Sequence, residues 1–434
     1  MKNNFIKLFK KPFVRNVAIV ATGTATAQAI TIAFAPVITR LYGPEAFGVL
    51  GVFTSMVGII SPIAALTYPG SIVLPKSDAD AKGLVHISLF ISGVMATFAT
   101  LMIVLFNKPI VSLMQIEVIE SFLYLIPFVI LFSAFLQVAQ QWLIRTKEFR
   151  LTAKVAFLKA LILDSAKAGI GLFNPVATVL VTLSTLGSVL HALMLVIGAS
   201  RSQRKQVIEP RESKTVKELA KKHKDFPLFR APQAFIHAIT GSLPVLLLAS
   251  FFGPASAGFY SIGKIVLDKP TQLISKSVAD VFYPRIAEAA YKGENLTHLI
   301  IKATLVLAAV GIIPFGIVLA FGPWIFGFVF GEEWVLAGEY ARWLALWLFF
   351  GFINRPSAKA IPVLNLQGQF LLYEVMSTVI RAGALIIGFY IYNSDIYAIV
   401  FSSLAGVVLN ALLITFTVRK SKSFYNSSNS AFVS

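Results

Sequence analysis

The sequence predicts an all-α membrane protein with about twelve transmembrane helices in two pseudo-symmetric lobes of six. Of its 434 residues, 57% are hydrophobic and only 13% are charged, which is too little polar surface for a water-soluble domain. Apolar runs of about 20 residues, the length that crosses a bilayer, recur along the whole chain. A glycine-proline corner also occurs twice. These three observations favour a multi-pass membrane protein built from a duplicated unit.

Each apolar run between charged or Pro/Gly-rich breaks predicts one membrane-spanning helix. The basic N-terminal segment resembles the start of a secretory signal. The apolar run behind it is too long, however, and lacks a small-residue cleavage site, so we expect a retained first helix. The expected helices cover residues 14–38, 46–74, 84–106, 121–142, 155–173, 176–199, 231–252, 258–282, 299–322, 340–364, 370–392 and 396–418.

The repeated corner indicates an internal duplication. "LYGPEAFGVL" at 41–50 returns as "FFGPASAGFY" at 251–260. Proline fixes φ and glycine tolerates unusual backbone angles, so a helix can end and restart there. The matched residues, at an offset of 210, are Gly43, Pro44 and Gly48 with Gly253, Pro254 and Gly258. A chance match is the alternative, but "IVLPK" at 72–76 also parallels "VFYPR" at 281–285.

The duplication suggests a division of the chain into four parts. Six spans per half is an even number, so both halves have the same orientation in the membrane, as in transporters with parallel repeats. We expect an N-terminal six-helix lobe at 1–199, a basic cytoplasmic linker at 200–230, a C-terminal six-helix lobe at 231–420 and a polar tail at 421–434. Two such lobes would enclose a central cavity and give alternating access by rocking.

The net charge of +18 reflects topology more than a polyanionic partner. Lysine and arginine gather before the first expected helix, after the second, fourth and twelfth, and in the linker that follows the sixth. By the positive-inside rule, both termini are then cytoplasmic. The basic stretches lack the interleaved aromatic residues that stack on bases, so no nucleic-acid partner is expected.

Soluble-enzyme chemistry has little support in the sequence. The chain has no cysteine, and its five histidines are scattered, so neither a thiolate nor a metal site is predicted. The "DAD" at 78–80 mimics the metal-binding DxD of glycosyltransferases, but we expect it in a short solvated loop. No catalytic residue, metal or cofactor is therefore predicted.

The eighth expected helix carries a polar ladder. An ionisable side chain inside a membrane is a functional candidate because burial in hydrocarbon is costly. A four-residue spacing places side chains on one slowly winding stripe, here about 24 Å long. The ladder consists of Lys264, Asp268, Gln272, Lys276 and Asp280. We favour a cavity-lining role for its two lysines over interhelical ion pairs or snorkelling from helix ends.

Further polar residues in the expected helices extend the candidate site. Besides the ladder residues Lys264, Asp268, Gln272 and Lys276, the substrate-binding candidates are Lys159, Lys167, Arg342, Arg381 and Gln28. The candidates for ion coupling are Asp164, Asp280 and Glu374. Interhelical ion pairs, such as Asp164 with Lys167 or Glu374 with Arg381, are the alternative for several of them. The net charge of the set is basic, and ammonium and guanidinium groups suit an anionic cargo.

Three long segments resemble a known family. "FAPVITRLYGPEAFGVLGVFTSMVGIISPIAALTYPGSIVLPKSDADA" (34–81), the stretch 225–289 and "FGEEWVLAGEYARWLALWLFFGFINRP" (330–356) are similar to bacterial polysaccharide-biosynthesis transporters. These are Wzx-type oligosaccharide flippases of the multidrug/oligosaccharidyl-lipid/polysaccharide exporter (MOP) superfamily, which includes the MATE transporters. The resemblance runs from about residue 14 to 420 and implies a MATE/MOP-like fold.

The resemblance implies a flippase in the bacterial inner membrane. Its cargo would be an undecaprenyl-diphosphate-linked oligosaccharide repeat unit for O-antigen, capsule or exopolysaccharide. Membrane lipids, a polysaccharide polymerase and a chain-length regulator are implied partners. Lys264 lies where the family often has a basic residue. Many members have Arg-Tyr-Glu near the end of the second helix, where this chain has Thr67, Tyr68 and Pro69, so a role carried by that Arg and Glu is in doubt.

Three rival functions remain open at this point. A drug or cation exporter of the same superfamily should have a cavity dominated by acidic residues. A membrane polymerase or glycosyltransferase should have a large extracytoplasmic loop and no six-plus-six repeat. A flippase for lipid-linked peptidoglycan precursors should have fourteen spans.

Overall fold

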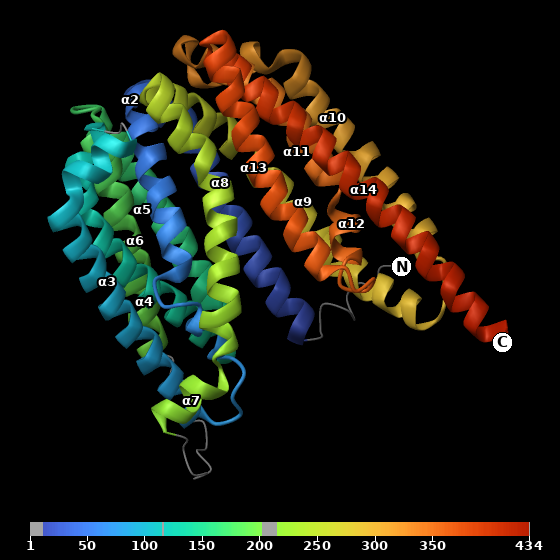
Figure 1. Ribbon diagram of the computed structural model, residues 1–434. Coiled ribbons are helices and arrows are strands. Elements are labelled where there is room, and N and C mark those ends of the chain that lie inside the picture. The colour runs from blue at the N-terminus through green and yellow to red at the C-terminus, as the bar shows by residue number, and fades with distance from the viewer. Residues whose placement is uncertain (1–11, 115–116, 202–214, 434) are drawn as a thin grey trace. The chain divides into compact units, whose positions relative to one another are not determined.

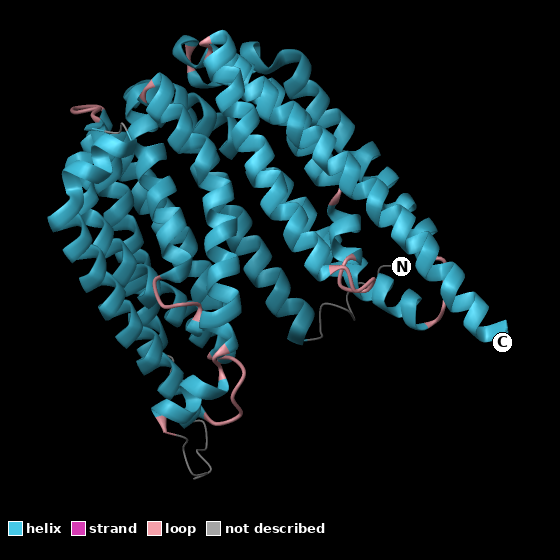
Figure 2. Cartoon of the chain, viewed as in Figure 1, coloured by secondary structure: helices cyan, strands magenta, loops and turns pink. Residues whose placement is uncertain are grey.

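The computed structural model describes residues 12–114, 117–201 and 215–433, and in these ranges it contains helices and short loops but no strand (Figure 2). The longer helices are α2 (Pro12–Ile60), α3 (Asp78–Met114), α4 (Ile126–Arg145), α5 (Phe149–Gly171), α6 (Ala177–Arg201), α8 (Ala231–Phe252), α9 (Pro254–Tyr291), α10 (Leu296–Phe330), α11 (Val335–Ile353), α13 (Gln367–Tyr392) and α14 (Asp395–Val433). The shorter ones are α7 (Val216–Lys222), α12 (Arg355–Ala360), η1 (Ser61–Ile63), η2 (Tyr68–Ser71), η3 (Glu117–Leu125), η4 (Phe226–Arg230) and η5 (Glu332–Trp334). The chain forms two compact units, Met1–Ser250 and Phe251–Ser434.

Helix α2 contains the first two expected spans. Its 49 residues would measure about 74 Å if straight, more than twice the thickness of the hydrocarbon core. The helix is interrupted at Gly43, where φ is 69° and ψ is 174°. Gly253, which precedes α9, has nearly the same conformation, with φ 85° and ψ 176°. The two copies of the corner thus share one glycine-dependent backbone geometry.

Two expectations about the first unit are wrong in detail. The second span was expected to run to residue 74, but α2 ends at Ile60 and short 3₁₀ helices follow, each with a proline in its first turn. Asp78 and Asp80 lie in the first turn of α3 instead of in a loop. An acidic first turn is favourable because it faces the positive end of the helix dipole.

Among the described residues, nine helices are long and apolar enough to cross a membrane, fewer than the twelve spans expected. The difference has two sources. The first two expected spans form the single helix α2. Neither α5 nor α9 is among the nine, and both carry charged residues that the sequence singled out. The number of crossings and the side of the termini therefore stay predictions.

The surface of the helices is that of a protein in lipid. In α13 the most apolar stretch has a mean hydropathy of 1.7, yet only 6% of its residues are buried inside the protein. On α10, Ile313 is 67% exposed and Leu305 is 63% exposed. Such continuous apolar surface is unstable in water and stable against hydrocarbon. The chain is a multi-pass membrane protein.

Within the first unit, α5 packs against α2 and α6, and α4 packs against α3 and α6 (Figure 1). A tight loop between η2 and α3 is held by Arg145 at the end of α4. The Arg145 guanidinium donates to the backbone oxygens of Ile72, Pro75 and Lys76, and its Nε and Nη2 both donate to Asp78 Oδ1, at 3.0 and 2.8 Å. One side chain therefore closes the connection between two helices.

The described end of the expected linker is folded against the first unit. Helix α7 begins with a capping box in which Thr215 and Glu218 each accept a hydrogen bond from the other's backbone N–H. Leu219, on the same helix, is fully buried in a cluster with Tyr68 and Leu84. Residues 202–214 of the linker lie outside the described residues.

Thr67 and Tyr68, between α2 and α3, make part of this contact. The Thr67 hydroxyl donates to the backbone oxygen of Phe226 at 2.9 Å, and the Tyr68 hydroxyl donates to that of Ala220 at 3.2 Å. Thr67 and Tyr68 therefore anchor the described end of the expected linker.

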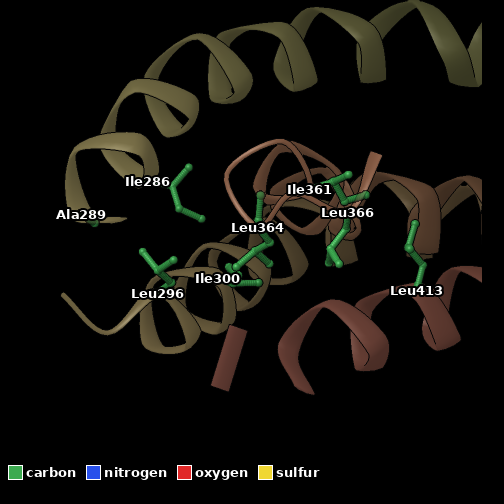
Figure 3. Packing of buried hydrophobic residues seen from close by; sticks show 9 residues of the cluster. Ile286, Ala289, Leu296, Ile300, Ile361, Leu364, Leu366 and Leu413 are labelled. Atoms are coloured by element: carbon green, nitrogen blue, oxygen red, sulfur yellow. The ribbon is translucent and has the colours of Figure 1, made fainter. Parts of the chain in front are cut away.

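In the second unit, α11 packs against α9, α10 and α14, and α13 packs against α14. An apolar cluster of nine buried residues joins the end of α9 to the start of α10, α12, the α12–α13 connection and α14. It contains Ile286, Leu296, Ile300 and Ile361, none of which is more than 2% exposed, with Leu413 of α14 at its edge (Figure 3). Phe370 and Tyr373 of α13 pack against this cluster.

Candidate functional site

Helix α9 places the first part of the polar ladder on one face. Tyr260, Lys264 and Asp268 follow one another at intervals of four residues, so their side chains share a stripe. Lys264 Nζ lies 6.0 Å from the centroid of the Tyr260 ring, which is a cation–π distance. Asp268 is close enough to attract Lys264 electrostatically. The ammonium is thus held between an aromatic ring and a carboxylate.

Arg381 of α13 joins this group. Its guanidinium carbon lies 3.6 Å from the centroid of the Trp347 ring on α11, the stacked arrangement in which arginine is held flat. Electrostatic contacts connect it to Tyr260 and to Lys264 of α9. Its Nε is buried without a hydrogen-bond partner. Three helices therefore bring two like charges together in the second unit, an arrangement that an anion would stabilise.

The second-unit polar cluster, as we call it, has two more charged members. Arg355, at the start of α12, lies within electrostatic reach of Asp268. Glu374 of α13 lies two turns before Arg381, beside Tyr373. The cluster consists of Lys264, Asp268, Arg355, Glu374 and Arg381, together with Tyr260, Trp347 and Tyr373. With three basic and two acidic residues, it retains a net positive charge.

A second polar group lies in the first unit, where α5 meets α2. Asp164 is only 7% exposed and accepts a hydrogen bond from the Thr31 hydroxyl at 2.8 Å. Lys167, one turn further along α5, is its electrostatic partner, and Lys159 lies near His191 of α6.

Gln28 is half-buried on α2, one turn before Thr31. The first unit therefore holds its buried acid with one hydroxyl and one ammonium, which suits either an interhelical ion pair or an ion site.

Other expected site residues are not part of these two groups. Arg342 donates to the backbone oxygen of Leu319 at 2.8 Å and pairs with Glu339 at 3.0 Å, so it joins α10 to α11. Gln272 is exposed on α9. The side chains of Lys276 and Asp280 lie outside the described residues. For these four, a role in the site stays a prediction.

Another, partly buried carboxylate had no signal in the sequence. Asp395, at the start of α14, accepts hydrogen bonds from the hydroxyls of Ser256 on α9 and Tyr340 on α11, while its other oxygen accepts from the backbone N–H of Ile396. Asp395 falls between the expected helices 370–392 and 396–418. Its partners lie 139 and 55 residues away in the chain, so only the fold shows the contact.

No group of three or more histidine, cysteine, aspartate or glutamate side chains in the described part of the chain is placed to hold a metal ion. The clustered chemistry is that of cations, aromatic rings and isolated carboxylates. Such a set can bind and release charged groups.

Comparison with known proteins shows the family of the chain. The sequence profile of the family described as polysaccharide biosynthesis protein matches residues 37–339, which is more than half of the sequence. The chain belongs to this family. Among curated proteins, the succinoglycan biosynthesis transport protein ExoT of Rhizobium meliloti (strain 1021) is 23% identical over 364 residues, which cover 80% of this chain and 67% of that protein.

Solved structures show the fold of this polysaccharide biosynthesis family member. An inward-facing multidrug resistance MATE family transporter of the MOP superfamily is similar with a TM-score of 0.70, at 14% identity, over 93% of this chain and 99% of that one. The lipid II flippase MurJ in an inward closed conformation matches with a TM-score of 0.70, at 14% identity, over 95% and 90%. The all-α, MATE/MOP-like fold expected from the sequence is confirmed. The relatives are named as transporters and a flippase, not as enzymes.

Proposed function

We propose that this protein moves an undecaprenyl-diphosphate-linked oligosaccharide from the cytoplasmic to the periplasmic leaflet of the bacterial inner membrane. Family membership and the name of its succinoglycan relative support a role in polysaccharide export. The likeness to MurJ supports a fold able to act on lipids. Transport of this kind makes and breaks no covalent bond.

The observation that carries the proposal is the second-unit polar cluster. A diphosphate needs cationic donors in a place shielded from bulk water. Lys264 and Arg381 supply such donors from helices α9 and α13, and the stacking on Trp347 holds the guanidinium plane in a fixed orientation. Arginine binds phosphate oxygens through two parallel N–H groups, whereas lysine acts as a point charge. We assign diphosphate binding to these two residues.

The carboxylates complete a release mechanism. Asp268 attracts both Lys264 and Arg355, so it competes with a bound anion for the same cations. A substrate that displaces the carboxylate can be displaced by it in turn, and binding stays reversible. Asp164 and Glu374 are proposed ion-coupling residues. The side-chain surroundings of Asp280, the third candidate, are not described.

Replacement of Arg381 tests the assignment. In a host that lacks the chromosomal copy, Arg381→Gln should reduce polysaccharide export at least tenfold, because the amide keeps hydrogen bonding but removes the charge. Arg381→Lys should recover part of the activity. The protein level in membranes is measured for every variant. Lys302→Ala, an exposed lysine on α10, is the matched control and should export normally.

Other results would redirect the assignment. Normal polysaccharide export by both Arg381→Gln and Lys264→Ala would show that the second-unit polar cluster does not bind the substrate. Loss of resistance to cationic drugs with unchanged polysaccharide would identify a drug exporter of the superfamily. The pathway served, whether O-antigen, capsule or exopolysaccharide, and the polymerase and chain-length regulator as partners belong to the same proposal.

A further inference from the structure

An apolar groove lies between α13 and α14 of the second unit. Its volume is about 480 Å³. The walls include Leu372 and Met376 of α13 and Leu412 and Phe416 of α14, and Gln369 is the one amide among its lining residues. A groove with these walls excludes charged or strongly hydrated ligands and accepts hydrocarbon.

The side chains at the base of the groove are buried, and those at its rim are exposed. At its base, Ile361 and Leu413 are 2% and 4% exposed and belong to the large apolar cluster in Figure 3. On the rim, Leu372 and Leu412 are 64% and 58% exposed. A chain could therefore enter from the surrounding lipid and lie on packed side chains without disturbing the core.

The groove adjoins the second-unit polar cluster. Tyr373 lines the groove and also lies within electrostatic reach of Arg381 and beside Glu374. Tyr373 and Arg381 are eight residues apart on one helix, a rise of about 12 Å. A single elongated ligand can thus place a hydrocarbon tail in the groove and an anionic headgroup at the guanidinium.

We propose that this groove holds the section of the substrate's polyprenyl tail next to the diphosphate, while the diphosphate binds at Arg381 and Lys264. The inference rests on the proposed function and adds the part of the protein that recognises the lipid. The neighbouring cations Arg381 and Lys264 suit a lipid whose headgroup is a diphosphate. The tail then stays in the membrane while the headgroup crosses.

A crosslinking experiment tests this directly. Since the protein has no cysteine, Leu412→Cys introduces a single thiol for benzophenone-maleimide. Ile313→Cys, on the lipid-exposed face of α10, is the matched control. Both full-length variants are reconstituted in phosphatidylethanolamine and phosphatidylglycerol vesicles with radiolabelled undecaprenyl diphosphate and irradiated.

We expect at least threefold more labelling at residue 412 than at 313. Excess unlabelled undecaprenyl diphosphate should abolish the difference, and excess phospholipid should not. Adding Arg381→Gln should lower labelling at 412 because the headgroup loses its anchor.

Equal labelling at the two positions would show an ordinary lipid-facing surface and overturn the groove proposal. Undiminished labelling with Arg381→Gln would overturn the pairing of tail and headgroup. Neither result contradicts the proposed transport function, which is tested separately by measuring polysaccharide export. Conversely, strong labelling at 412 by a protein that exports no polysaccharide would separate lipid binding from the proposed function.

Discussion

At the scale of single residues, a few residues determine the geometry of the connections between helices. Most exposed side chains on the helices are apolar and could replace one another. The geometry of the loops and corners therefore depends on polar contacts and on glycine. Arg145 and Gly253 are the clearest examples. One satisfies several backbone oxygens at once, and the other adopts a backbone conformation that other residues avoid.

Replacing Arg145 by lysine should destabilise the first unit. The side chain is 12% exposed and contacts three backbone oxygens and Asp78. An ammonium cannot reach all of them, and each lost charge-assisted hydrogen bond costs about 1.5–3 kcal/mol. We expect Arg145→Lys to lower the thermal unfolding temperature of the purified protein in detergent by several degrees. Arg150→Lys, at an exposed arginine, is the control; an equal effect there would contradict the specific role of Arg145.

Gly253→Ala isolates a purely conformational cost. No atom lies within 4 Å of a Cβ at this position, so sterics with neighbours are absent and only the φ of 85° matters. The strain should lower the free energy of unfolding by about 1–3 kcal/mol.

Gly241→Ala in α8 provides the comparison, because the helix interior there also has space for a Cβ. That change should be neutral or stabilising. If both variants melt at the same temperature as the parent, the corner does not depend on glycine.

At the scale of helices, close backbone approach decides the packing of α10 and α11. Gly322 and Gly338 face each other so closely that a Cβ on Gly338 would lie 2.5 Å from the Gly322 backbone oxygen. The neighbouring Arg342 then reaches the oxygen of Leu319 across the interface. Small residues at such crossings are the usual means of helix association in membranes.

Gly338→Ala should separate these two helices. The obstructing atoms are backbone, which cannot move aside as a flexible side chain can, so we expect a clear loss of folded protein after detergent extraction. Gly316→Ala on α10 meets nothing within 4 Å and should behave like the parent. Extraction of both variants as folded monodisperse protein, measured by size-exclusion chromatography, would contradict the close-packing account.

At the scale of the whole molecule, the sequence was informative where chemistry is periodic or costly. The apolar runs predicted helices, and the spacing of Lys264 and Asp268 placed them on one face of α9. Arg381 stood out because a charge within an apolar helix is expensive. Tyr260 and Trp347 gave no such signal, since aromatic residues make up 12% of the chain and any of them could pack against lipid.

Contacts between residues far apart in the chain could not be predicted from the sequence, because no local pattern marks them. Asp395 has its hydroxyl partners on two distant helices, and the anchoring of α7 depends on the 3₁₀ turns that replace the end of the expected second helix. The shortfall of apolar character in α5 and α9 reflects the charges that mark the candidate sites.

The most direct test of the transport proposal is to follow the lipid-linked repeat unit in the native host after deletion of this gene. The repeat unit is quantified by leaflet, and surface polysaccharide is measured alongside, with the parent gene or Arg381→Gln restored. We predict that lipid-linked units accumulate in the cytoplasmic leaflet and that no polymer forms outside, with rescue by the parent alone. Units accumulating in the periplasmic leaflet instead would contradict the account and indicate a function after the flip.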